Sequence, residues 1–68
     1  MQSRKYKCRF QGDYEWEDIR AYSPEEAAEE FVAEIGSECT RYVVVNGVGT
    51  FRVDCIYEPE YHAIRIKK

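Results

Sequence analysis

Hydrophobic and polar residues alternate along the first third of the chain, as they do in half-buried β-strands. From Arg4 to Phe10, apolar side chains occupy every second position between lysine and arginine residues. Gln11-Gly12-Asp13 has a turn composition, and the alternation resumes from Tyr14 to Tyr22. The second segment changes phase partway, which predicts a β-bulge near Glu17-Asp18. The pattern therefore predicts two antiparallel strands, over residues 4–10 and 14–22.

The next segment begins with the clearest local signal in the chain, a helix start at Ser23-Pro24. We expect Ser23 to cap the helix, Pro24 to occupy its first position and Glu26 to accept a hydrogen bond from the backbone N–H of the cap. Gly36 can adopt the left-handed conformation that ends a helix, so the helix should end near Ile35. At helical spacing the apolar side chains share one face, which we expect to pack: Ala27, Ala28, Phe31, Val32 and Ile35.

A hairpin is predicted after the helix. The run from Arg41 to Val45 is typical of a strand, and Asn46-Gly47 is the dipeptide that a two-residue type I′ turn prefers. The returning strand, Val48 to Tyr57, contains Gly49, where we expect a bulge. Its inward side chains are predicted to be Phe51, Val53, Cys55 and Tyr57.

The last strand is predicted after a break at Glu58-Pro59-Glu60. It runs from Tyr61 to Lys67, with Ile64 and Ile66 on one side. The element order is then ββαβββ: a single α+β domain over residues 1–68, an antiparallel sheet of about five strands with one helix packed on one face. The opposite face must meet water or a partner.

Composition supports a folded domain and limits its location. The 68 residues are 44% hydrophobic and 34% charged, which is typical of a globular unit. The chain has no run of about 18 apolar residues, and its N-terminus lacks the core of a signal peptide. We therefore predict a cytoplasmic protein that does not span a membrane.

The sequence offers no pattern of catalytic or metal-binding residues. Three cysteines and one histidine are scattered singly, so neither a disulfide framework nor a zinc site from Cys8, Cys39, Cys55 and His62 is predicted. Cys8 and Cys55 lie on the apolar sides of their strands and should be core thiols, whereas Cys39 is the candidate for an exposed thiol. No nucleophile and base occur at a suggestive spacing. We expect neither an enzyme nor a cofactor.

Charge changes this picture, because it is unevenly distributed. The formal net charge is −3, but residues 1–12 carry four basic and no acidic side chains, whereas residues 13–38 carry ten acidic and one basic. The helix has like-charge pairs four residues apart and no lysine, an arrangement that destabilises it. Such a face is either a solubilising surface or an acidic recognition surface. The predicted partner-binding residues are Glu25, Glu26, Glu29, Glu30, Glu34 and Glu38, with Asp13, Glu15, Glu17 and Asp18 as candidate additions.

Two alternatives use the sheet instead. The exposed sheet face could bind nucleic acid, with Tyr42 and Tyr61 stacking bases; its predicted basic residues are Lys5, Lys7, Arg9, Arg52 and Arg65. A sequence pI of about 5.1 argues against this reading, and ion pairs with Glu15, Glu17 and Asp54 would neutralise the same face. The other alternative is an assembly subunit that dimerises through its sheet edge or an exposed Val43/Val45 surface.

A resemblance at the level of protein class adds a hypothesis about function. The segment from Ala21 to Val32, a strand leading into a capped acidic helix, resembles the strand-to-helix junction of many small bacterial and phage-encoded α+β proteins. Size, acidity and the missing catalytic set are similar to the anti-CRISPR proteins of phages and mobile elements. That resemblance implies an inhibitor that occupies a nucleic-acid-binding or protein-binding surface of a host complex. We therefore predict a non-enzymatic binding module, a monomer or homodimer, whose acidic helix docks on a basic surface of a larger protein.

Overall fold

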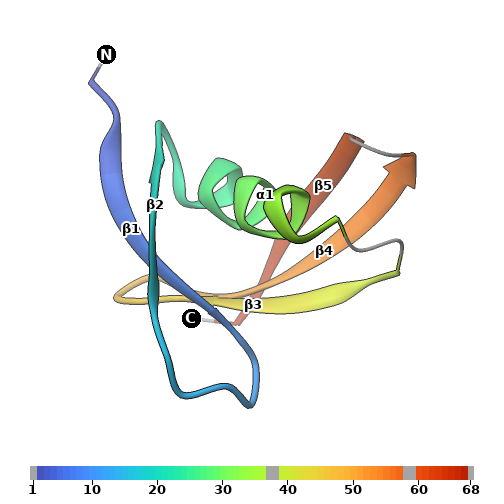
Figure 1. Cartoon of the computed structure of the whole chain (residues 1–68), viewed down its shortest axis with the longest axis horizontal. Helices are drawn as coiled ribbons and strands as arrows, with labels where there is room; N and C mark the ends of the chain where they lie inside the picture. The colour runs from blue at the N-terminus through green and yellow to red at the C-terminus, as the bar shows by residue number, and fades with distance from the viewer. Residues whose placement is uncertain (1, 37–38, 58–59, 68) are drawn as a thin grey trace.

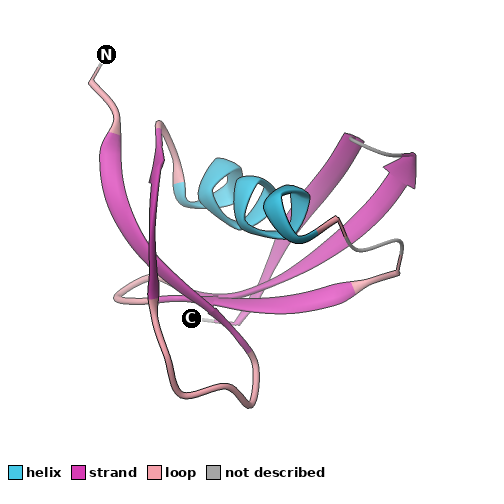
Figure 2. Ribbon diagram, viewed as in Figure 1, coloured by secondary structure: helices cyan, strands magenta, loops and turns pink. Residues whose placement is uncertain are grey.

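The computed structural model describes residues 2–36, 39–57 and 60–67, and it confirms the predicted order ββαβββ. The strands are β1 (Arg4–Phe10), β2 (Glu17–Ala21), β3 (Arg41–Val45), β4 (Gly49–Tyr57) and β5 (Glu60–Lys67), and the helix is α1 (Pro24–Ile35). The strands form one antiparallel sheet in the order β2-β1-β3-β4-β5 (Figure 1). The helix contacts every strand from one side of this sheet (Figure 2), and we call the other side the open face.

Strand register decides which side chains face the helix. Cys8 of β1 pairs with Val45 of β3, Val43 pairs with Phe51 of β4, and Val53 pairs with Ala63 of β5. These pairs line the helix-covered face, and the intervening positions line the open face. The largest fully buried side chains are Phe51, Val32, Val43, Val45, Val53 and Cys8. The predicted association surface at Val43/Val45 is therefore wrong, because both valines belong to the core.

The ends of α1 follow the predicted capping chemistry closely. Ser23 Oγ accepts a hydrogen bond from the Glu26 backbone N–H at 3.1 Å, and Glu26 Oε1 accepts one from the backbone N–H of Tyr22 at 3.0 Å. The reciprocal bond thus reaches one residue further back than predicted. Gly36 closes the helix at φ 76°, and its N–H donates to the Val32 carbonyl.

The packed face of the helix is one residue shorter than predicted. Ala27, Ala28, Phe31 and Val32 are buried, but Ile35 is 51% exposed. Ile35 is the last helical residue, next to the left-handed Gly36, and it borders an open hollow that Phe10 and Phe31 also line. Helical periodicity places a residue on a face but does not show how far the opposing layer extends.

The second strand is shorter than its alternation predicted. β2 begins at Glu17, Tyr14 is 94% exposed, and the β1–β2 register runs from Arg4↔Ala21 to Cys8↔Glu17 with no bulge. The change of phase arises because Tyr14 and Trp16 belong to a loop over residues 11–16. That loop turns at Gly12, whose φ is 97°, and the Asp13 N–H donates to the Phe10 carbonyl.

The β3–β4 connection is one residue longer than the sequence predicted. Val45 pairs with Gly49, so three residues form the loop, and the Val48 N–H donates to the Val45 carbonyl at 3.0 Å. A type I′ turn requires positive φ at Asn46, but among the described residues only glycines have positive φ. The predicted bulge at Gly49 is replaced by register shifts at Thr50/Phe51 and Cys55/Tyr57.

Strand β5 turns Tyr61 and Ala63 toward the helix, although Ile64 and Ile66 are its most apolar side chains. Tyr61 and Ala63 are buried under the helix, whereas Ile64 and Ile66 are 39% and 48% exposed on the strand's other positions. The register with β4 sets this choice, because Ala63 pairs with the buried Val53. The predicted inward position of Tyr57 and the break at 58–59 lie outside what the structure describes.

Candidate interaction surfaces

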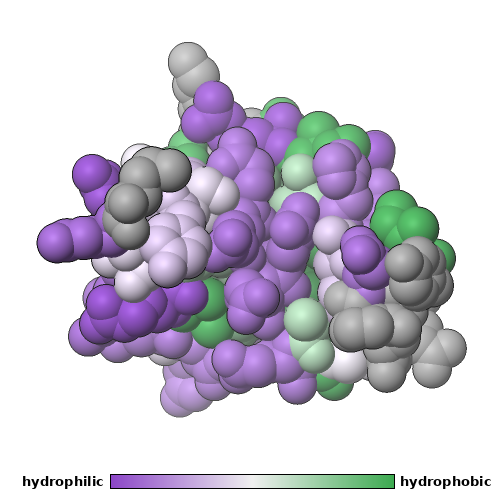
Figure 3. Space-filling model, turned by 90° about the horizontal axis from the view of Figure 1, so that it is seen from above, coloured by the Kyte–Doolittle hydropathy of each residue, from purple (hydrophilic) through white to green (hydrophobic). Residues whose placement is uncertain are grey.

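The acidic side of the molecule is built on the outer face of α1. The side chains of Glu25, Glu30 and Glu34 are exposed, and the surface over the helix is largely hydrophilic (Figure 3). The last turn of α1 contains no basic residue. Within the described ranges none of these three carboxylates forms an ion pair. Glu38, also predicted for this surface, lies outside those ranges.

Two of the predicted partner-binding glutamates form hydrogen bonds within the fold. Glu26 is half-buried and is held by its bond to Tyr22. Glu29 is half-buried, and its Oε2 accepts a hydrogen bond from the backbone N–H of Ala63 at 2.9 Å. Because β5 is an edge strand, this bond satisfies an N–H that would otherwise be free to pair with another chain. Glu29 therefore works against the predicted dimerisation through this sheet edge.

Removing the Glu29 carboxylate should destabilise the domain measurably. Glu29→Ala leaves the partly buried Ala63 N–H without its acceptor, a loss of about 1–3 kcal/mol in the free energy of unfolding. Urea denaturation measures this change. The matched control is Glu30→Ala, one residue along on the exposed side, which should change stability by no more than about 0.5 kcal/mol. Equal effects of the two substitutions would show that the Glu29 bond contributes nothing.

The β1–β2 loop extends the acidic side beyond the helix. Asp13, Glu15 and Glu17 border a hollow of about 200 Å³ that Phe10, Phe31 and Ile35 also line. The three carboxylates therefore lie beside the C-terminal half of α1. We define the acidic surface as Glu25, Glu30, Glu34, Asp13, Glu15 and Glu17. Asp18, a candidate addition in the sequence, faces the opposite side of the sheet.

Asp18 forms ion pairs with two of the basic side chains on the open face. Its Oδ1 lies 3.0 Å from Lys7 Nζ and its Oδ2 lies 4.0 Å from Lys5 Nζ. Asp18, and not Glu15 or Glu17, is thus the cross-strand partner of these lysines. The hydrogen bond from Lys7 lowers the pKa of Asp18 below its ordinary value of 3.8, and the charges of Lys7 and Lys5 lower it further.

The lowered pKa of Asp18 predicts a pH dependence. A carboxylate whose pKa is lower in the folded state stabilises the fold above its unfolded pKa, and this contribution is lost as the pH falls through the folded value. The Asp18 carboxyl should titrate below pH 3.8 in an NMR titration, and Lys7→Gln should move the midpoint up. Lys5→Gln, the more distant partner, should move it less. An unchanged midpoint in Lys7→Gln would contradict the assigned cause.

The remaining predicted basic residues do not form one track. The Nε of Arg52 lies 3.4 Å from Asp54 Oδ2, and Asp54 Oδ1 accepts a hydrogen bond from Thr40 at 3.0 Å. Arg65 is the register partner of Phe51, so it does not share the row of Arg52. Of the two predicted stacking residues, Tyr42 is 42% exposed on the open face, but Tyr61 is buried beneath the helix. The five predicted basic residues therefore form no single continuous strip across the sheet.

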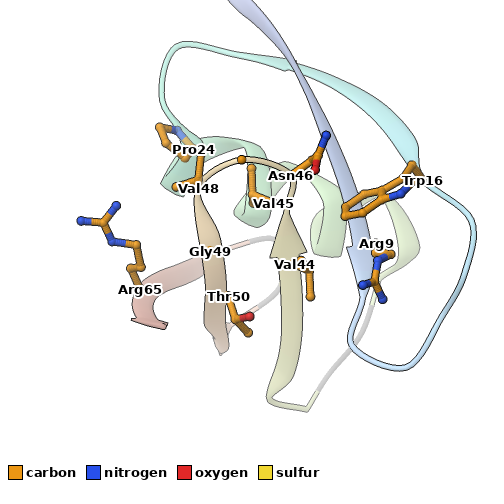
Figure 4. Close-up of a pocket in the computed structure, with 11 residues that line it drawn as sticks. Arg9, Trp16, Pro24, Val44, Val45, Asn46, Val48, Gly49, Thr50 and Arg65 are labelled. Carbon is orange, nitrogen blue, oxygen red and sulfur yellow. The ribbon is translucent and has the colours of Figure 1, made fainter. Parts of the chain in front are cut away.

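A groove that the sequence did not suggest follows the β3–β4 hairpin, and residues from both sides of the sheet line it (Figure 4). It has a volume of about 870 Å³; Val44 and Thr50 form its floor, and Trp16 with Arg9 lies on one side (Figure 4). The Arg9 guanidinium carbon lies 4.7 Å from the centroid of the Trp16 ring, and Arg9 Nη1 donates to the Asp13 carbonyl. In the sequence this site is marked only by the break in the alternation of apolar and polar residues near Trp16. A β-bulge produces the same break, so the sequence alone did not indicate a groove.

Cys8 lies on β1 and His62 on β5, two strands that are not neighbours in the sheet. Cys8 is fully buried on the helix-covered face, and burial raises the pKa of its thiol to about 11. His62 pairs with Asp54 in the register and is exposed, and Cys39 is exposed near the start of β3. In the part of the chain with defined positions, no group of three or more His, Cys, Asp or Glu side chains could hold a metal ion.

The chain matches no protein-family model, no curated protein and no solved structure. No helix among the described residues is both long enough and apolar enough to cross a bilayer. Function must therefore be inferred from the surfaces themselves. These are an acidic surface on the helix side and a groove at the β3–β4 hairpin.

Proposed function

We propose that this chain is a non-enzymatic cytoplasmic binding protein that docks its acidic surface on a basic surface of a larger protein or protein complex. One observation carries the proposal: the ion pairs among the described residues use Asp18 and Asp54 on the open face, whereas the exposed helix glutamates have no cationic partner there. The acidic charge is thus available for an external partner, whereas those internal ion pairs engage Lys5, Lys7 and Arg52.

The spacing of the carboxylates suits a surface rich in arginine and lysine. Residues four apart on a helix lie about 5–6 Å from one another, so Glu30 and Glu34 present a regular row of negative charge. Carboxylates accept short, charge-assisted hydrogen bonds from guanidinium and ammonium groups. A basic surface that otherwise binds phosphates would therefore also accept this row. Affinity should fall as salt screens the exposed charges.

The helix retains these charges at a cost to its own stability. Glu26/Glu30 and Glu30/Glu34 are like-charge pairs at i,i+4 spacing, each destabilising by about 0.2–0.5 kcal/mol. A single lysine in the row would remove the repulsion and still keep the surface soluble. Recognition of a basic partner gives a reason for the uniform sign. The resemblance to anti-CRISPR proteins supports an inhibitor of phage or mobile-element origin as the biological setting.

Affinity capture with a matched variant tests the proposal. The tagged protein is incubated with nuclease-treated bacterial lysate, beside a Glu30→Lys/Glu34→Lys variant, and retained proteins are eluted with rising salt. We expect a defined protein that survives nuclease treatment, elutes with salt and is absent from the variant. The purified partner must then bind directly. A captured protein that both forms retain equally would contradict the role of the acidic surface.

A further inference from the structure

The hollow beside the C-terminal half of α1 combines an apolar lining with three carboxylates. We propose that it receives the side chain of an arginine residue presented by the basic partner. The apolar stem of that arginine would lie on the apolar lining, and its guanidinium would bond the carboxylates of Asp13, Glu15 and Glu17. The inference rests on the proposed function, because it names the group of the partner that this part of the acidic surface binds.

Glu17 places a carboxylate in a row of side chains that is otherwise apolar. It pairs with the buried Cys8 of β1, so it belongs to the helix-facing row of β2. The next two members of that row, Ile19 and Ala21, are buried, whereas Glu17 is exposed. Position 17 thus carries charge where the sheet alone would favour an apolar side chain, and departures of this kind occur at functional surfaces.

The loop that carries the other two carboxylates is held in place by hydrogen bonds. The Asp13 N–H donates to the Phe10 carbonyl at 3.0 Å, and the Asp13 carbonyl accepts a bond from Arg9 Nη1 at 2.6 Å. The backbone next to Glu15 is therefore fixed before a partner arrives. A fixed loop loses less conformational entropy when it binds, which favours recognition.

The apolar part of the lining comes from Phe10, Phe31 and Ile35. The ring centroids of Phe10 and Phe31 are 4.7 Å apart, so the two rings support each other. Ile35 is exposed at the helix end beside them. A partner side chain that covers Ile35 would remove apolar surface from water, which favours a ligand with an apolar stem.

The size of the hollow favours one side chain over a free small molecule. Its volume is about 200 Å³, below the range of about 300–1,000 Å³ that is usual for small-molecule sites. A long side chain that extends from a docked protein needs only this space, because the rest of the partner lies on the surrounding surface.

Charge selects a cation in this hollow. Among the described residues that line it, three are carboxylates and none is cationic. None of the three carboxylates forms an ion pair within the described part of the chain. A guanidinium has five N–H donors in a planar fork, and it is more weakly hydrated than the ammonium group of lysine. It can therefore bond more than one carboxylate and lie against an aromatic ring at the same time.

The protein itself already contains a guanidinium packed on one of the lining rings. The guanidinium carbon of Arg41 lies 3.9 Å from the centroid of the Phe10 ring, a cation–π contact. Arg41 is not among the residues that line the hollow, so it leaves the hollow unfilled. The contact shows that the surroundings of Phe10 accept the chemical group that we assign to the partner.

NMR titration with single-residue amides tests the hollow without the partner. The full chain at low salt is titrated with N-acetylarginine amide, N-acetyllysine amide and N-acetylcitrulline amide, which has the shape of arginine without its charge. We expect saturable shifts of the backbone resonances of Glu15, Glu17 and Ile35 with arginine, weaker binding of lysine and no saturable shifts with citrulline.

Three results of this titration would overturn the proposal. The first is the absence of saturable arginine shifts up to about 50 mM, a concentration at which even a weak site is occupied. The second is equal binding of lysine and arginine. The third is a set of arginine shifts no larger at Glu17 and Ile35 than at Glu25 and Glu30, which would indicate a general attraction to acidic charge.

Variants at exposed positions identify the groups that bind the amide. Glu15→Gln/Glu17→Gln should weaken binding of the arginine amide about tenfold, because charge-assisted hydrogen bonds are lost. The matched control, Glu25→Gln/Glu30→Gln, removes the same charge from the outer face of α1 and should change binding less than about twofold. Ile35→Ala keeps the charge but removes apolar surface, and it should weaken binding about threefold. An unchanged affinity in Glu15→Gln/Glu17→Gln would overturn the proposal.

Partner capture distinguishes this proposal from the proposed function. We expect Glu15→Gln/Glu17→Gln to capture less of the partner than the parent chain does. Equal capture by both, with loss of capture in Glu30→Lys/Glu34→Lys, would leave the proposed function standing and overturn the arginine site. Binding of the arginine amide in the hollow by a chain that captures no protein would support the arginine site and contradict the proposed function.

Discussion

Glu30→Lys combined with Glu34→Lys is expected to weaken binding to the basic partner by about 10- to 100-fold at low ionic strength. Each reversal replaces an attraction of about 0.2–1 kcal/mol with a repulsion of similar size, and about 1.4 kcal/mol corresponds to tenfold in affinity. Glu26 is left intact, because its carboxylate bonds the Tyr22 backbone and its loss would weaken the helix start. Isothermal titration calorimetry with the purified partner measures the change, and the difference should shrink as salt is added.

The double reversal should not harm the fold. The lysine introduced at position 30 would attract Glu26 one turn before it, and the lysine introduced at position 34 would lie in the last turn, where the helix dipole favours a cation. Thermal unfolding should therefore show a melting temperature at least as high as that of the parent chain. A variant that binds poorly and also melts lower would have lost its fold as well as its charge, and it would not count as support.

Two further double variants distinguish the effect of charge on the acidic surface from the effect of net charge. Glu30→Gln/Glu34→Gln and Gln2→Lys/Ser3→Lys each make the net charge more positive by two, but only the first changes the acidic surface. We expect the glutamine variant to bind more weakly and the N-terminal lysine variant to bind much as the parent does. Equal losses in both would indicate that overall charge, and not the helix surface, controls binding.

The elements with local signals were predicted well. Ser23-Pro24 and Gly36 define the helix ends through bonds made within four residues, so the sequence around them is sufficient. Strand β1 was predicted with its observed bounds, because its alternation is complete between Arg4 and Phe10. The order of elements and the single covered face follow from these local signals together with the need to bury one apolar layer.

What could not be predicted depends on contacts between distant residues. Ile64 and Ile66 are more apolar than Tyr61 and Ala63, but pairing of β5 with β4 turns the latter two inward. Shifting the pairing of a strand by one residue moves its side chains to the opposite face of the sheet. The sequence of β5 alone does not determine which register it adopts with β4. Tyr14 likewise alternates with its polar neighbours as a strand residue does, yet it is nearly fully exposed in a loop.

The candidate surfaces differ in the same way: features set by neighbouring residues could be predicted from the sequence, and features set by distant contacts could not. Helical spacing identified the acidic row, because positions four apart share a face whatever the tertiary structure. The structural role of Glu29 could not be found in this way, since its partner Ala63 is 34 residues away. The groove likewise requires that β3, β4 and the loop containing Trp16 be brought together. Only the position of Trp16, where the alternation fails, marks that groove in the sequence.

Phe51→Ala is expected to have the largest effect on stability of any single substitution considered. Phe51 is fully buried on β4, opposite Val43 of β3. Truncating a buried phenylalanine costs about 3–5 kcal/mol, because transfer energy is lost and a cavity remains. At about 0.05–0.15 kcal/mol per residue, a domain of this size has roughly 3–10 kcal/mol in total. The variant should therefore lose at least about 12 °C in melting temperature, and at the low end of that range it would not fold at 25 °C.

Two further substitutions show whether the loss of stability in Phe51→Ala comes from the cavity. Ile56→Ala lies on the same strand but removes a side chain that is 61% exposed, so it should change stability by no more than about 0.5 kcal/mol. Phe51→Leu keeps most of the buried volume and should fall between the parent and Phe51→Ala in urea denaturation. If Phe51→Leu were as unstable as Phe51→Ala, the shape of the ring and not its volume would be decisive. If Ile56→Ala were equally damaging, the open face would be covered in solution, and the apolar side chains exposed there would belong to an interface between copies of the chain.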